Sequence, residues 1–98
     1  MEDFDVLFLV SRPESEPMLR GLLGACARRK ARCACFFTGP AAVLAADPEI
    51  GALLREGPRS AVCEYSWERF GHGDCPMHLG SQTDNSAMAA AARRIVSL

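Results

Sequence analysis

FDVLFLVSRP, residues 4–13, decides the fold class. Residues 4–10 form a nearly continuous apolar run, which stops at Ser11-Arg12-Pro13. A strand with one solvated face alternates apolar and polar residues, whereas a continuous apolar run is typical of a strand that is buried on both faces. The stretch therefore predicts a strand of a parallel sheet that is covered by helices.

Downstream of this strand, helical and extended patterns alternate along the chain. Ser15 is predicted to cap a helix whose apolar side chains recur at helical spacing. These side chains are Met18, Leu19, Leu22, Leu23 and Cys26. The remaining pattern predicts strands over residues 32–38, 60–63 and 77–79, a helix that is broken near residues 47–48 and continues to 54, and helices over 66–70 and 83–94.

This alternation predicts right-handed βαβ units and hence a parallel sheet. We expect one three-layer α/β/α domain over residues 1–98, with a mostly parallel sheet of about four strands in a flavodoxin-like topology. A chain of 98 residues has room for one such domain and its core.

The net charge of the chain and its N-terminal residues restrict the classes of partner that we expect. The net charge is -1 and the basic residues are scattered, so no basic stripe for nucleic acid is expected. MEDFDVLFLV begins with acidic residues where a signal peptide would be cationic. We therefore expect a cytoplasmic protein that does not bind a membrane, and we predict no cofactor.

Five cysteines, an odd number, indicate free thiols in a reducing compartment. Cys26 lies on the apolar stripe of the first helix. Cys33 and Cys35 are expected to be core residues that point to opposite faces of their strand. These three thiols are predicted to be structural.

Cys63 differs from these three because it ends a buried strand and precedes a helical turn. Backbone N–H groups and the helix dipole at such a position favour a thiolate and lower its pKa. We predict Cys63 as the reactive residue, with the alternative that it only packs. Cys75 is expected to be exposed, either as a resolving thiol for Cys63 or as an ordinary loop residue.

Parallel sheets bind ligands beyond the carboxyl ends of their strands, which places several polar segments around Cys63. A helix cap is the alternative role for some of them, with Ser81 or Thr83 as the cap. The predicted binding residues are Ser11, Arg12, Thr38, Gly39, Glu64, Ser66, Trp67, Ser81, Gln82, Thr83 and Asn85.

GHGDCPMHLGSQTDN, residues 71–85, contains both histidines of the chain. His72, Cys75 and His78 have the spacing H-x2-C-x2-H, and Cys63 or Asp74 could complete a tetrahedral zinc site. This spacing is not a common structural zinc pattern, and a proline at position 76 restricts the backbone between two of the ligands. We predict no metal and interpret the stretch as the polar wall of a pocket over Cys63.

AVCEYSWERFG, residues 61–71, resembles the third-strand region of the DsrE/DsrF-like family. The specific part of the resemblance is Cys63, Ser66, Trp67 and Gly71, and the order of strands and helices agrees over most of the chain. The resemblance implies a compact α/β/α protein that is commonly oligomeric. In some members a cysteine carries sulfur as a persulfide between partner proteins, a role that would belong to Cys63.

Three functions remain open from the sequence. The first is a sulfur carrier or sulfurtransferase-like protein with sulfur donor and acceptor proteins as partners. The alternatives are a non-catalytic binding or assembly protein of the same fold and a small zinc-binding domain. A homo-oligomer is expected, because 49% of the residues are hydrophobic and one small domain is not expected to bury Trp67 and Phe70 fully.

Overall fold

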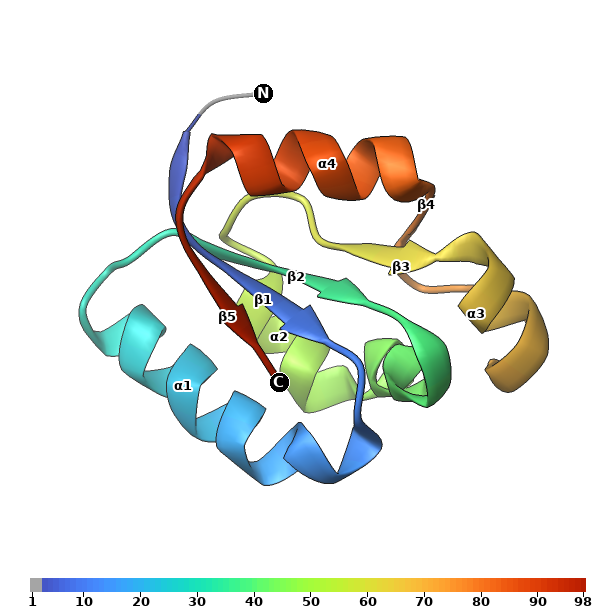
Figure 1. Ribbon diagram of the computed structural model, residues 1–98. Helices are drawn as coiled ribbons and strands as arrows, with labels where there is room; N and C mark the ends of the chain where they lie inside the picture. Colours follow the sequence, from blue (N-terminus) through green and yellow to red (C-terminus); the bar gives the residue numbers. More distant parts are fainter. Residues whose placement is uncertain (1–2) are drawn as a thin grey trace.

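The structure is a computed structural model that describes residues 3–98. In this part of the chain it contains a five-stranded, fully parallel sheet in the order β4-β3-β2-β1-β5, with helices on both faces (Figure 1). The strands are β1 (Phe4–Val10), β2 (Cys33–Phe37), β3 (Ala61–Cys63), β4 (His78–Gly80) and β5 (Ala92–Ser97). The helices are η1 (Pro13–Ser15), α1 (Glu16–Arg28), η2 (Gly39–Ala46), α2 (Pro48–Leu54), α3 (Glu64–Phe70) and α4 (Gln82–Ala91).

The apolar run that opens the chain is an inner strand, as predicted. β1 pairs in parallel with β2 on one side, where Val6 lies opposite Cys33, and with β5 on the other, where Phe4 lies opposite Ala92. Leu7 is completely buried, because β1 has a strand on each side and a core on each face.

The helices lie on opposite faces of the sheet because of the path of the chain. β1, β2, β3 and β4 follow one another across the sheet in one direction, and right-handed crossovers then place the connecting helices on one face. The connection from β4 to β5 returns across the whole sheet, so α4 lies on the other face (Figure 1). The predicted α/β class with a parallel sheet is confirmed, although the sheet has five strands rather than about four and its order differs from the order 2-1-3-4-5 of flavodoxin itself.

The two faces carry cores of unequal size. The major core, under α1 and α2, includes Phe8, Val10, Leu19, Leu23, Cys33, Cys35, Phe37, Ile50, Leu54, Val62 and Trp67. The minor core, under α4, consists of Phe4, Leu7, Ala34, Phe36, Ala61, Met88 and Ala91. Cys33 and Cys35 share the major core, so the expectation that they point to opposite faces is wrong: residues two apart in a strand lie on the same face.

Three further expectations about the elements are corrected. The last helix ends at Ala91 rather than Arg94, because residues 92–97 pair with β1 as the fifth strand. The helix predicted to break near residues 47–48 does break there and continues to Leu54, but its first part, Gly39–Ala46, is a 3₁₀ helix. α3 begins directly after β3, at Glu64, two residues earlier than predicted.

The helices are short, and the longest, α1, has 13 residues. Within residues 3–98, no helix combines the length and the apolar character that crossing a membrane requires.

Candidate functional site

Cys63 is the last residue of β3 and the residue immediately before α3. Its backbone is extended, with φ -58° and ψ 122°, so the chain turns from strand to helix at this residue. The side chain is half-buried and packs against the minor core. The strand-end position that the sequence predicts for this thiol is therefore present.

The electrostatic environment of Cys63 favours its thiolate. Burial raises the pKa of the thiol, but hydrogen-bond donors of Ser66, Tyr65 and Thr38 outweigh burial and hold the pKa below its ordinary value. The donors are the Ser66 hydroxyl and backbone N–H, the Tyr65 backbone N–H and the Thr38 hydroxyl. Donors to the charged form stabilise it relative to the neutral thiol.

Ser66 is held in place by the segment that follows β2. The Gly39 backbone N–H donates to Ser66 Oγ at 2.7 Å, and Thr38 Oγ1 lies 3.5 Å from the same oxygen. Because Ser66 Oγ accepts the Gly39 N–H, its own hydrogen is available for the Cys63 sulfur. Gly39 has φ +59°, a left-handed conformation that suits glycine, so the sequence Thr38-Gly39 aims this N–H at Ser66.

The two thiols of β2 have a different environment. Burial, together with a hydrogen bond to Cys26, raises the pKa of Cys33 to about 12. Burial also raises the pKa of Cys35. Cys33 and Cys35 are therefore held in their neutral form, which agrees with the predicted structural role, whereas the pKa of Cys63 is shifted in the opposite direction.

Trp67 does not line the site. It is 7% exposed and packs in the major core, and its Nε1–H donates to the Gly73 carbonyl oxygen at 3.0 Å. A Cβ at Gly71 would come within 2.3 Å of the Trp67 ring, so only glycine permits this packing. The expectation that Trp67 is incompletely buried is wrong, because the turn after α3 folds back over the indole.

Cys75 is not brought to Cys63. It is half-buried and packs against the major core, whereas Cys63 packs against the minor core on the other face of the sheet. The hydrogen bond from Trp67 to Gly73 holds this loop against a residue of the major core. The predicted partnership of the two thiols therefore has no support in their placement.

Residues 71–85 thus divide into two parts. Residues 72–74 are exposed, and the chain then returns to β4, where Gly80 pairs with Cys63. Ser81 follows and caps α4: its Oγ accepts the Asp84 N–H at 3.4 Å, while Asp84 Oδ2 accepts the Ser81 N–H at 2.8 Å. This is the capping role that the sequence analysis weighed for Ser81, and the spacing Ser81-x-x-Asp84 could have identified both partners.

The remaining predicted binding residues are dispersed. Ser11 donates its backbone N–H and its hydroxyl to the Leu98 carbonyl oxygen, at 2.9 and 3.4 Å, and so ties the C-terminal residue to the end of β1. Asn85 is part-buried, and its Nδ2 donates to Gln82 Oε1 at 3.4 Å. Arg12, Glu64, Gln82 and Thr83 are exposed. The compact part of the site is therefore Cys63 with Ser66, Thr38 and Gly39.

The histidines do not complete a metal site in the described part of the chain, where no three His, Cys, Asp or Glu side chains are arranged to hold an ion. His72 is exposed. His78 Nε2 lies 3.7 Å from Asp84 Oδ1, which belongs to the α4 cap.

No family model, curated protein or solved structure matches this chain. The resemblance to the DsrE/DsrF-like family therefore stays a hypothesis that the residues around Cys63 carry.

Proposed function

We propose that the protein is a sulfur carrier or sulfurtransferase-like protein in which Cys63 accepts sulfane sulfur and passes it on. The observation that supports this proposal is the surroundings of the Cys63 sulfur, where donors of Ser66, Tyr65 and Thr38 favour the thiolate. A thiolate is both the nucleophile that takes up sulfur and the leaving group that releases it.

In the proposed reaction, the Cys63 thiolate attacks the outer sulfur of a donor persulfide. A bond forms between Cys63 Sγ and that sulfur, and the donor leaves as a thiolate. In the second step an acceptor thiolate attacks the outer sulfur of the Cys63 persulfide, and the Cys63 thiolate is released. The same donors of Ser66 and Thr38 stabilise the charge on Sγ at the start and at the end of this cycle.

Tyr65 supports a protein as donor or acceptor. It follows Cys63 by two residues, and its side chain is 77% exposed. An exposed aromatic side chain beside a reactive residue is a favourable contact for a partner protein, because tyrosine is enriched at the centres of interfaces. A cytoplasmic location belongs to this proposal, since a persulfide cycle needs free thiols, and the cysteines of residues 3–98 are all free.

The test is loading with inorganic polysulfide, followed by peptide mass spectrometry of all cysteines and by release of the sulfur to cyanide as thiocyanate. We expect one added sulfur on Cys63, and thiocyanate in equal amount. Cys63→Ser should lose both signals. Cys75→Ser is the matched control, because Cys75 is also half-buried, and it should load like the wild type. Loading that persists in Cys63→Ser would contradict the proposal.

We also propose that the protein associates with further copies of itself. Large apolar side chains remain exposed on both edge strands, with Leu79 on β4 at 44% and Ile95 on β5 at 48%. Edge strands with apolar side chains favour pairing with another chain. Equilibrium sedimentation should show an oligomer, whereas a strict monomer at micromolar concentration would contradict the association.

A further inference from the structure

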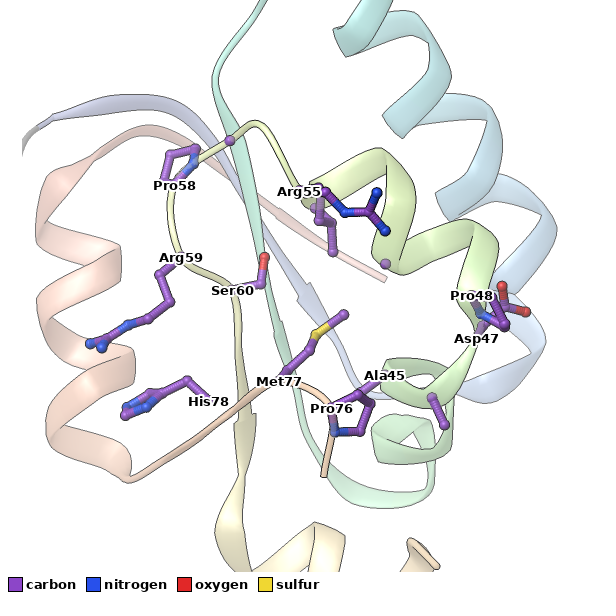
Figure 2. A pocket seen from close by; sticks show the side chains of 14 residues that line it. Ala45, Asp47, Pro48, Arg55, Pro58, Arg59, Ser60, Pro76, Met77 and His78 are labelled. Atoms are coloured by element: carbon purple, nitrogen blue, oxygen red, sulfur yellow. The ribbon is translucent and has the colours of Figure 1, made fainter. Parts of the chain in front are cut away.

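Two pockets border α2. One, of about 520 Å³, lies at the amino-terminal ends of β3 and β4 (Figure 2). In Figure 2 its arginine side chains point apart, Arg55 over α2 and Arg59 toward His78, so they do not converge on one charged group. The other pocket, of about 410 Å³, lies between α1, α2 and the start of β2, and its lining contains the two thiols of Cys26 and Cys33.

The thiols of Cys26 and Cys33 face each other. Cys26 lies in the last turn of α1, and Cys33 is the first residue of β2. Their side chains are hydrogen-bonded, and both pack in the major core. A bond between a thiolate and a metal such as zinc is about 2.3 Å long. An ion can therefore join two sulfurs that are already in hydrogen-bond contact after small movements of the side chains.

The backbone on either side holds the two thiols in place. The Ala31 N–H donates to the Cys26 carbonyl oxygen at 2.9 Å, and Cys33 pairs with Val6 in the sheet. Lys30 has φ +56°, a left-handed conformation that is usual for glycine at the end of a helix, and so makes the turn between them tight. Ligands that are held in place before binding lose less entropy when they bind.

The number of ligands decides which metal the pair suits. A structural zinc site takes four ligands. Among residues 3–98, no three His, Cys, Asp or Glu side chains are arranged around one ion, so the thiol pair has no further ligands of these types. Two thiolates on opposite sides of the ion are a complete ligand set for Cu(I), a soft ion that thiolates select.

The surroundings of the pair are apolar. The pocket is also lined by Leu23, Ala27, Ala31 and Leu53. A hydrophobic shell around a metal limits the access of solvent and so tunes its redox potential. An ion held between Cys26 and Cys33 would be shielded from water by these side chains, which favours the reduced Cu(I) state over Cu(II).

The charges around the pocket suit the complex that would form. Cu(I) between two thiolates carries one excess negative charge. Two cationic residues, Lys30 and Arg32, line the pocket together with one carboxylate, that of Glu56. An excess of positive charge near the complex stabilises it.

We propose that Cys26 and Cys33 bind one Cu(I) ion as a pair of thiolates at this pocket. The ion arrives as a complex with two small thiolates. Each cysteine sulfur replaces one of them, and each cysteine proton passes to the thiolate that leaves, so charge and protons balance. The pocket has room for such a carrier thiol. The site is independent of the sulfur chemistry proposed for Cys63, which packs against the minor core on the other face of the sheet.

The experiment is an anaerobic titration of the full chain with Cu(I) in competition with bicinchoninate, followed by X-ray absorption spectroscopy of the loaded protein. We expect the chain to withdraw one ion from bicinchoninate, and the spectrum to show two sulfur ligands. In native protein, bound Cu(I) should also protect Cys26 from iodoacetamide, as measured on its own peptide by mass spectrometry.

Cys26→Ser should no longer withdraw Cu(I), and because Cys26 is only half-buried this variant is expected to fold. Cys75→Ser is the matched control, since Cys75 is also half-buried and packs against the same core, and it should bind Cu(I) like the wild type. Cys63→Ser should also bind like the wild type, which separates this site from sulfur transfer. Binding that survives in Cys26→Ser, binding that is lost in Cys63→Ser, or a loaded site with a single sulfur ligand would overturn the proposal.

Discussion

Replacing Ser66 by alanine should raise the pKa of Cys63. The Ser66 hydroxyl is an acceptor for the Gly39 N–H at 2.7 Å, and its hydrogen is one of the donors that lower the Cys63 pKa. A hydrogen bond to a charged group contributes about 1.5–3 kcal/mol, and one pKa unit corresponds to about 1.4 kcal/mol. Because the thiol is only half-buried, water replaces part of the loss, so the pKa of Cys63 should rise by less than full loss of this hydrogen bond implies.

Ser60→Ala is the matched control. Ser60 and Ser66 are both 8% exposed, and each hydroxyl accepts one backbone N–H. Both variants leave a buried N–H unpaired, so both should lose about 1–3 kcal/mol of stability. Of these two serines, Ser66 is the one that donates to the Cys63 sulfur.

The assay is the rate of alkylation of Cys63 by iodoacetamide as a function of pH, followed on its own peptide by mass spectrometry. The wild type and Ser60→Ala should share one midpoint below that of an ordinary cysteine, and the midpoint of Ser66→Ala should be higher. Equal midpoints for the two serine variants would refute the assignment of Ser66 as a donor to the thiolate.

Three more outcomes are expected. Gly71→Ala should destabilise the protein by about 1–3 kcal/mol in thermal unfolding, because the new Cβ would collide with the Trp67 ring. Gly21→Ala is the control: this glycine lies in α1 with open space around it, so the alanine should stabilise the protein by about 0.5–1 kcal/mol. Ser81→Ala should cost about 1 kcal/mol in urea unfolding through loss of the α4 cap, and no loss would contradict that cap. Because the pKa of Cys63 is lower in the folded protein, its thiolate stabilises the fold at pH values above the pKa of the unfolded chain, and this stabilisation is lost as the pH falls through the folded-state pKa. The difference in unfolding free energy between wild type and Cys63→Ser should therefore grow with pH across that window. A constant difference would argue against a shifted pKa.

Local patterns predicted most of the fold. The apolar run of residues 4–10 identified a strand with two buried faces, and the alternation of elements predicted the parallel sheet. β5 was missed because the alanine-rich helix before it has no sequence break at Ala91. Its strand signal is confined to Ile95 and Val96, and its pairing with β1 is a contact between the two ends of the chain.

The candidate site could be predicted only where it is local. Cys63 and Ser66 lie three residues apart at the start of a helix, so their proximity follows from the sequence. The Gly39 N–H that orients Ser66 lies 27 residues away along the chain, and no sequence pattern predicts this contact. The predicted pairing of Cys75 with Cys63 is not supported by their placement, since Cys75 packs against the major core and Cys63 against the minor core.

The pocket at the amino-terminal ends of β3 and β4 had no signal in the sequence. Its lining comes from residues 45–60 and 76–78, and neither segment contains a recognisable ligand motif. Only the folded chain shows that Asp47 is neutralised by Arg20 while Arg55 and Arg59 are left without ion-pair partners among residues 3–98.

The most direct measurement of the central claim is peptide mass spectrometry of the protein isolated without reductant, with every cysteine quantified. The account predicts one extra sulfur atom on the peptide that contains Cys63 and unmodified thiols at Cys33 and Cys35, because the surroundings of Cys63 favour its thiolate whereas burial raises the pKa of the other two. An unmodified Cys63 that also alkylates as slowly as the buried thiols would contradict it, and the cysteine would then be a packing residue at the end of β3.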